Sequence, residues 1–200
     1  MITIIIFFVN NNEMDSSTDN IKFFIDGACS NNQSKNVSVC GSGLYISVLD
    51  ETYSKRITKG LVQHIKVNGE EHIITFDKCS NNVGELYTVI LALIHIIRLK
   101  IKTPTIVSDS TYVIGMFKNN NKAKTNIELI EIIRKIINVY QIEINWIHVK
   151  GHQSVNNTKG RLTSTQELKR STSLSGSTLL IIGNNKADEA ATKAAKVDTK

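Results

Sequence analysis

The stretch IKFFIDGACSNN, residues 21–32, decides how the rest of the chain is interpreted. Apolar residues recur at positions 21, 23 and 25 in a segment rich in aromatic and β-branched residues, which favours a half-buried strand. Asp26 stands at the far end of this strand, and Gly27 comes directly after it. Because Asp-Gly is a common turn former, Asp26 alone supports a turn at least as well as a functional carboxylate. Other carboxylates converging on Asp26 would decide between the two.

The composition suits one soluble domain with a polyanionic partner. The 200 residues are 41% hydrophobic, which is enough for a packed core. Lys and Arg total 24 against 18 Asp and Glu, so the net charge of +6 favours nucleic acid without establishing it. Cys29, Cys40 and Cys79 are odd in number and lack C-x-x-C spacing, which argues against a disulfide framework and a zinc site. A reducing compartment fits best, so we expect an intracellular protein, cytoplasmic or nuclear.

Residues 1–20 differ in composition from the rest of the chain. Met1–Val9 is apolar, but it is too short to span a bilayer and lacks the basic start and cleavage site of a signal peptide. A tail rich in Ser, Asp and Asn comes next and offers little to pack. We therefore expect a flexible leader over residues 1–20, no membrane partner, and one domain over residues 21–200. Met14 is an alternative start of translation.

Beyond residue 32 the hydrophobic pattern switches between strand and helix periods. Three- and four-residue spacing predicts helices over 83–100, 111–117 and 129–140, and an alanine-rich run predicts another over 184–196. Strands are predicted over 40–49, 53–61, 72–76, 105–107 and 141–149, with Asn68-Gly69 as a hairpin turn. Residues 51–77 suggest an antiparallel meander, and the polar stretch 153–183 an inserted loop. This order predicts a mixed sheet with helices on its faces.

Four acids lie where these elements begin or end: Asp26, Glu85, Asp109 and Asp188. Each has an ordinary structural explanation. Asp26 suits a turn, Glu85 a capping box with Asn82, Asp109 a helix start, and Asp188 the first turn of a helix. Helices lying on a sheet bring such junctions together, and crowded carboxylates repel one another unless cations neutralise them. Oxygen-only ligands favour Mg²⁺ or Mn²⁺ over zinc.

Five motifs around these residues occur in order between Ile21 and Lys196. They are FIDGAC with Asp26, SNNVGEL with Glu85, VSDSTYV with Asp109, WIHVKGH with His152 and GNNKAD with Asp188. Their combination resembles type 1 ribonuclease H, whose members cut the RNA strand of RNA–DNA hybrids. The resemblance implies an α/β ribonuclease H-like fold, with a mixed five-stranded sheet, antiparallel over its first three strands, and helices on both faces.

The resemblance also implies a metal centre. Asp26, Glu85, Asp109 and Asp188 would hold two Mg²⁺ ions, with Mn²⁺ as a substitute. Asp26 would bridge both ions, Asp188 would help to hold the ion that activates water, and Glu85 with Asp109 would help to hold the other. Such a pair of ions promotes attack by water and stabilises the leaving 3′ oxygen, which gives 5′-phosphate and 3′-hydroxyl ends.

Further residues match positions that act on protons or substrate. His152 matches the family's mobile histidine, which handles protons or helps product to leave, and a pKa near neutrality suits either task. Asn32, Asn81 and Asn82 match positions at the minor groove of the hybrid, where amides can bond the 2′-hydroxyls of RNA. Turn, cap and loop roles remain alternatives for these residues. We expect an RNA–DNA hybrid as the partner and a monomeric protein.

The chain departs from the family's pattern in two places. A long stretch separates His152 from Asp188, where the family has a short loop. Only Lys118, Lys122 and Lys124 stand where bacterial members carry a larger basic protrusion. The long stretch before Asp188 leaves open a nucleic-acid-binding module that does not cut. Another nuclease of the same fold, such as a junction resolvase, is a second alternative, because carboxylate-metal sites recur with many substrates.

Overall fold

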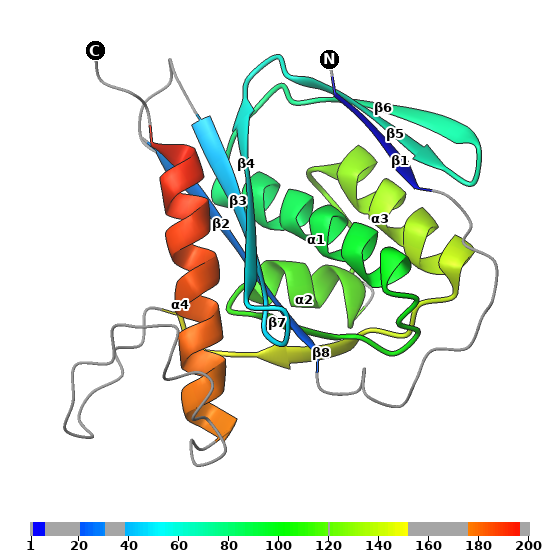
Figure 1. Cartoon of the computed structure of the whole chain (residues 1–200). Coiled ribbons are helices and arrows are strands. Elements are labelled where there is room, and N and C mark those ends of the chain that lie inside the picture. Colours follow the sequence, from blue (N-terminus) through cyan, green and yellow to red (C-terminus); the bar gives the residue numbers. More distant parts are fainter. Residues whose placement is uncertain (1, 7–20, 31–38, 120, 152–175, 197–200) are drawn as a thin grey trace.

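The computed structural model describes residues 2–6, 21–30, 39–119, 121–151 and 176–196 (Figure 1). The strands are β1 (Ile2–Ile6), β2 (Lys22–Ser30), β3 (Val39–Ile46), β4 (Glu51–Thr58), β5 (Val62–Val67), β6 (Glu70–Thr75), β7 (Thr105–Ser108) and β8 (Asn145–His148). The helices are α1 (Asn81–Arg98), α2 (Thr111–Phe117), α3 (Ile127–Tyr140) and α4 (Gly176–Ala195). None of these helices is both long and apolar enough to cross a lipid bilayer.

Five strands form the central sheet in the order β4-β3-β2-β7-β8. The first three along the chain, β2, β3 and β4, are antiparallel, whereas β7 runs parallel to both β2 and β8. The α1 helix packs on one face of this sheet and α4 on the other (Figure 1). The predicted mixed sheet with helices on both faces is therefore confirmed.

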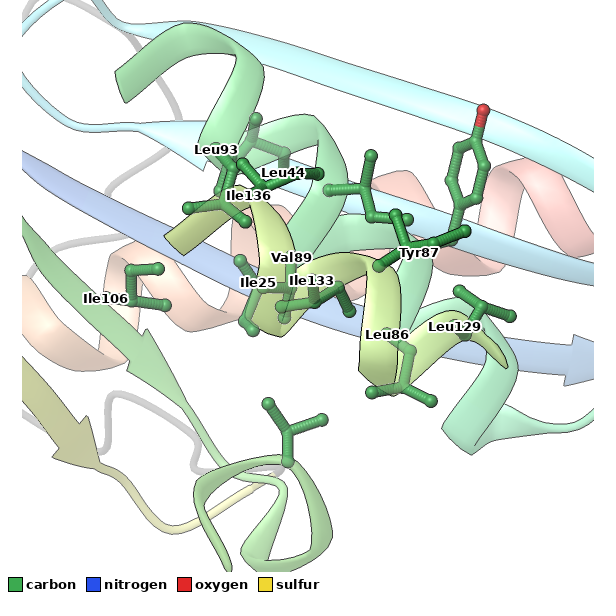
Figure 2. Close-up of a cluster of buried hydrophobic side chains, with 14 of the residues drawn as sticks. Ile25, Leu44, Leu86, Tyr87, Val89, Leu93, Ile106, Leu129, Ile133 and Ile136 are labelled. Carbon is green, nitrogen blue, oxygen red and sulfur yellow. The ribbon is translucent and has the colours of Figure 1, made fainter. Parts of the chain in front are cut away.

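The central strand β2 is buried on both faces. Phe23 and Ile25 lie in the main core, where side chains of α1 pack against the sheet and those of α3 pack against α1. Figure 2 shows part of this cluster. Phe24 points to the other face and packs with Tyr45, Val107 and Ala187 of α4. A strand covered on both sides by helices needs apolar residues in succession, which explains why Phe23, Phe24 and Ile25 occur side by side.

A second sheet of three strands, in the order β1-β5-β6, corrects two expectations. Residues 51–77 do not form one meander, because β4 joins the central sheet while β5 and β6 form a separate hairpin. This hairpin buries Ile65, Val67 and Ile74 in the core with α1 and α3. Its turn at Asn68-Gly69 is confirmed, since both residues have the positive φ of a tight hairpin.

The expected leader over residues 1–20 is corrected at its start. Ile2–Ile6 form β1, which pairs in parallel with β5. The free edge of a hairpin presents unpaired backbone groups that a β-branched segment can satisfy. Residues 7–20 lie outside the described part of the chain, and the division into a leader and one domain stays a prediction.

Three helices, α1, α3 and α4, begin earlier than expected, and for α1 and α4 the difference concerns an acid. The α1 helix begins at Asn81 and is capped by Ser80, whose side chain accepts a hydrogen bond from the Val83 N–H, so Asn82 is not the cap. The α4 helix begins at Gly176, so residues 176–183 of the expected inserted loop are helical. The remainder of that loop lies outside the described residues. Both corrections change the interpretation of an acid, Glu85 in α1 and Asp188 in α4.

Candidate active site

Three carboxylates meet where the pairing of β2 with β7 ends. The last paired residues are Phe24 and Val107, two positions before Asp26 and Asp109 respectively. Glu85 reaches the same place from α1. One carboxylate oxygen from each of Asp26, Glu85 and Asp109 lies within 4.8 Å of the others. Asp109 directly follows the carboxyl end of β7, and sites in open α/β sheets typically lie outside the carboxyl ends of strands.

The ordinary structural explanations do not hold for Asp26, Glu85 and Asp188, whereas Asp109 does lie at a helix start. Asp26 lies within β2, which continues to Ser30, and is therefore not in a turn. Glu85 is not part of a capping box, because Ser80 caps α1. Asp109 precedes the cap of α2, and Asp188 lies in the interior of α4 rather than in its first turn. Local helix or turn chemistry thus does not explain the positions of Asp26, Glu85 and Asp188.

Close packing of α1 on the sheet brings Glu85 to Asp26. A side chain on Gly27 would lie 2.5 Å from the backbone carbonyl oxygen of Asn81 and 2.7 Å from the carbonyl carbon of Gly84, so only glycine permits this approach. The buried Thr88 hydroxyl lies 2.8 Å from the carbonyl oxygens of both Asp26 and Gly84. It therefore fixes the backbone at Asp26 to the turn of α1 that carries Glu85.

Ser110 orients the Glu85 carboxylate. Its hydroxyl donates a hydrogen bond of 2.5 Å to Glu85 Oε2 and accepts one of 3.2 Å from the Val113 N–H. The Ser110 N–H in turn donates to Ser108 Oγ at 3.1 Å. One residue thus caps α2 and holds an acid of α1 in place.

Burial and mutual repulsion disfavour ionisation of the cluster. The pKa of Asp26 is raised to about 8, first by burial and next by the charge of Asp109. The charges of Asp188 and Glu85 contribute to this rise in pKa, and the hydrogen bond of 2.7 Å from the Gly27 N–H opposes it. Burial and Asp109 likewise raise the pKa of Glu85 to about 7, against the lowering effect of the Ser110 hydrogen bond. Cations bound here would relieve both effects.

The fourth acid, Asp188, lies beside this group without belonging to its tight core. Its side chain is half-buried, and its charge contributes to the raised pKa of Asp26. The backbone of α4 passes so close to β3 that a side chain on Gly43 would lie 2.5 Å from the Ala191 nitrogen. Gly43 is the register partner of Asp26, so this contact sets the distance from Asp188 to Asp26.

The remaining predicted site residues divide into two groups. Asn81 is exposed in the first turn of α1, next to Gly27, and Asn82 is half-buried beside it. His152 and Asn32 lie outside the described residues, and their roles stay predictions. Sequence reasoning missed Ser110, Thr88 and the contact of Gly151 with the Asp109 carboxylate. The only sequence signal for Ser110 was its place as a cap-forming residue between a strand and a helix.

Comparison with known proteins gives one family. The family model described as RNase H matches residues 18–167, well over half of the chain. The N-terminal RNase H domain of Rv2228c from Mycobacterium tuberculosis, solved as a fusion with maltose-binding protein, is 14% identical; 88% of this chain and 94% of that chain are covered, with a TM-score of 0.48. RNase H1 from the halophilic archaeon Halobacterium salinarum NRC-1 is 15% identical, with 87% and 96% covered and a TM-score of 0.48. A search of curated proteins gave no match.

Proposed function

The chain belongs to the RNase H family, as the match over residues 18–167 shows, and from this premise we propose that it hydrolyses the RNA strand of RNA–DNA hybrids with bound divalent cations. Members of the family are nucleases of such hybrids. One observation carries the proposal for this chain: Asp26, Glu85 and Asp109 converge within 4.8 Å in a largely buried site. A protein that only bound nucleic acid would gain nothing from such negative charge near phosphates.

The donor atoms fit a hard divalent cation. All of them are carboxylate oxygens, which suit Mg²⁺ or Mn²⁺ better than zinc. The raised pKa values of Asp26 and Glu85 point the same way, because the site favours positive charge, either as protons or as a metal. We assign one ion to Asp26, Glu85 and Asp109, and a second to Asp26 and Asp188.

In this proposal each residue has a distinct task. A pair of ions would supply Lewis-acid chemistry, activating water for in-line attack and stabilising the leaving 3′ oxygen, which gives 5′-phosphate and 3′-hydroxyl products. Asp26 would contribute to holding either ion, and the Ser110 hydroxyl orients the Glu85 carboxylate by its hydrogen bond. His152 remains the candidate for proton handling during turnover or for product release.

Recognition of RNA falls to the asparagines. Asn81 is exposed at the start of α1, close to the carboxylate cluster, where its amide can bond a 2′-hydroxyl in the minor groove of a hybrid. Asn82 and Asn32 are proposed for the same surface. The net charge of +6 supports binding to a polyanion.

Cleavage of an end-labelled RNA–DNA hybrid tests the proposal. Single-stranded RNA, duplex DNA and branched DNA serve as substrate controls, each with Mg²⁺, with Mn²⁺ and with chelator. We expect metal-dependent loss of the RNA strand of the hybrid alone, abolished in Asp26→Asn. Glu143→Gln, which changes an exposed acid before β8, should retain activity. Hybrid binding without cleavage in either metal would instead indicate a binding module, and preference for branched DNA a different nuclease.

A further inference from the structure

The chain that leaves β8 runs along Asp109. The parallel register of β7 with β8 ends at Ser108 and His148. Pairing continues one step further, because the Val149 N–H donates to the Ser108 carbonyl at 3.0 Å. The His148 ring nitrogen Nε2 lies 3.2 Å from the Asp109 carbonyl oxygen. Residues 148–151 therefore form one wall beside the backbone of Asp109.

Gly151 lies against the carboxylate of Asp109 itself. A side-chain carbon on Gly151 would overlap Asp109 Oδ2 and would lie 3.3 Å from Cγ and 3.6 Å from Cβ of the same residue. These three atoms are the nearest that it would meet. The other two acids of the cluster are oriented by hydrogen bonds, Glu85 by Ser110 and Asp26 by the Gly27 N–H. The Asp109 carboxylate instead lies in van der Waals contact with Gly151.

The backbone at Gly151 does not explain the glycine. Among the described glycines, only Gly60 and Gly69 have the positive φ that disfavours other residues. Alanine could therefore adopt the backbone conformation of Gly151 without strain. The requirement for glycine here is one of space, and the space is occupied by the Asp109 carboxylate.

We propose that Gly151 is a positioning residue for the metal centre, whose missing side chain leaves room for Asp109 to point at Asp26 and Glu85. This inference rests on the proposed metal site. A methyl group at residue 151 would be relieved by rotation of Asp109, because the atom it meets is the free end of a flexible side chain. The fold would lose little, whereas the carboxylate would leave its place in the cluster.

Gly151→Ala tests this directly, with Gly176→Ala as the matched control. A side chain at Gly176 would meet nothing within 4 Å, and its φ is not positive. We expect Gly151→Ala to weaken Mn²⁺ binding by about tenfold to a hundredfold, the usual cost of disturbing a ligand's support. Its Tm in chelator should equal that of the wild type, and Gly176→Ala should change neither quantity. Wild-type Mn²⁺ affinity in Gly151→Ala would overturn the inference.

A second comparison asks whether Gly151 acts through Asp109. In Asp109→Ala the carboxylate is gone, and of the three atoms nearest to a methyl group at residue 151 the Cβ at 3.6 Å remains, an ordinary contact. We therefore expect Asp109→Ala and the double variant Asp109→Ala/Gly151→Ala to bind Mn²⁺ equally. An additional loss in the double variant would show that Gly151 acts independently of Asp109 and would reject the inference.

The measurement separates this inference from the proposed function. The protein is titrated with Mn²⁺ in the absence of nucleic acid, and the concentration of free Mn²⁺ is measured from its electron paramagnetic resonance signal. This method also measures weak affinities. Failure of the wild type to bind Mn²⁺ would reject the proposed metal site and this inference with it. Binding by the wild type that Gly151→Ala leaves unchanged would reject only the role of Gly151.

Discussion

The hydroxyl of Ser110 lies 2.5 Å from Glu85 Oε2 and joins the start of α2 to an acid in the second turn of α1. The same oxygen accepts a hydrogen bond from the Val113 N–H and so caps α2. A residue with both contacts couples the stability of a helix to the orientation of a candidate metal ligand. The two effects can be separated by experiment, because α1 has a serine cap of its own.

Ser110→Ala should lower both stability and metal affinity. Loss of the cap costs about 1 kcal/mol in free energy of unfolding. Because the Ser110 hydrogen bond lowers the pKa of Glu85, its removal should raise that pKa further and weaken Mn²⁺ binding, by about tenfold. Ser80→Ala is the control, since Ser80 caps α1 through the Val83 N–H. Urea unfolding should show a loss of stability in both variants, at least as large in Ser110→Ala, which also loses the hydrogen bond to Glu85. Mn²⁺ titration should show weaker metal binding only in Ser110→Ala.

Stability of the metal-free protein should fall as pH rises. The pKa of Asp26 is about 8 in the folded chain against an ordinary value of 3.8, and that of Glu85 is about 7 against 4.5. Between the ordinary and the folded-state pKa of each group, the folded chain binds more protons than the unfolded chain. Stability is therefore fullest below the ordinary values, declines as pH rises above them, and has lost this contribution once pH passes about 7 to 8. Urea unfolding in chelator, at pH values between the ordinary and the folded-state pKa values, measures how steeply the free energy of unfolding falls. A flat profile would contradict the raised pKa values.

Stabilisation by bound metal should increase with pH, opposite to the trend of the metal-free protein. Cations compete with protons for the same carboxylates, so Mg²⁺ binds more tightly once the groups have lost their protons. The rise in Tm on adding Mg²⁺ should therefore be larger near pH 8.5 than near pH 5.5. Asp26→Asn provides the control, because an amide cannot take part in this exchange and should remove most of the difference. An equal rise in Tm at both pH values in the wild type would separate metal binding from these acids.

Asp26→Asn should stabilise the metal-free protein while abolishing cleavage. The substitution removes a buried negative charge that is repelled by the charges of Asp109, Asp188 and Glu85. We expect a gain in free energy of unfolding on the order of 1 kcal/mol or more at pH 9 in chelator. Glu143→Gln should change neither stability nor activity, since Glu143 is exposed. A loss of stability in Asp26→Asn would mean that its carboxylate supports the fold rather than straining it.

The sequence predicted the central sheet well because local residue spacing determines its strands and the helix that packs on them. The apolar residues of β2 and the apolar face of α1 are visible in the sequence, and they place Asp26 and Glu85 in two elements that must pack together. The expected half-buried strand is wrong in one respect, because β2 continues past Asp26 to Ser30 and is buried on both faces. Local sequence did not determine which residue caps α1. Ser80, Asn81 and Asn82 are all good cap formers, so sequence alone does not select among them.

Long-range packing accounts for the other differences. Residues before Asn184 are rich in Ser and Thr and suggested a loop, yet α4 includes them from Gly176. Leu180 packs against the cluster of Phe24, Tyr45 and Val107, and this burial outweighs weak helix propensity. The contact of Gly151 with Asp109 depends on β8 lying beside β7, an arrangement that no local pattern encodes.

Gly43→Ala should damage both the fold and the site, in contrast to Gly151→Ala. A methyl group on Gly43 would meet the Ala187 carbonyl oxygen and the Ala191 nitrogen, which are backbone atoms of α4 and cannot rotate away. The helix must therefore move outward and take Asp188 with it, at a cost of about 1–3 kcal/mol in free energy of unfolding. Urea unfolding measures that cost, and hybrid cleavage by the folded fraction measures the displacement of Asp188. Unchanged stability would show that α4 lies farther from β3 than the structure has it, and Asp188 farther from Asp26.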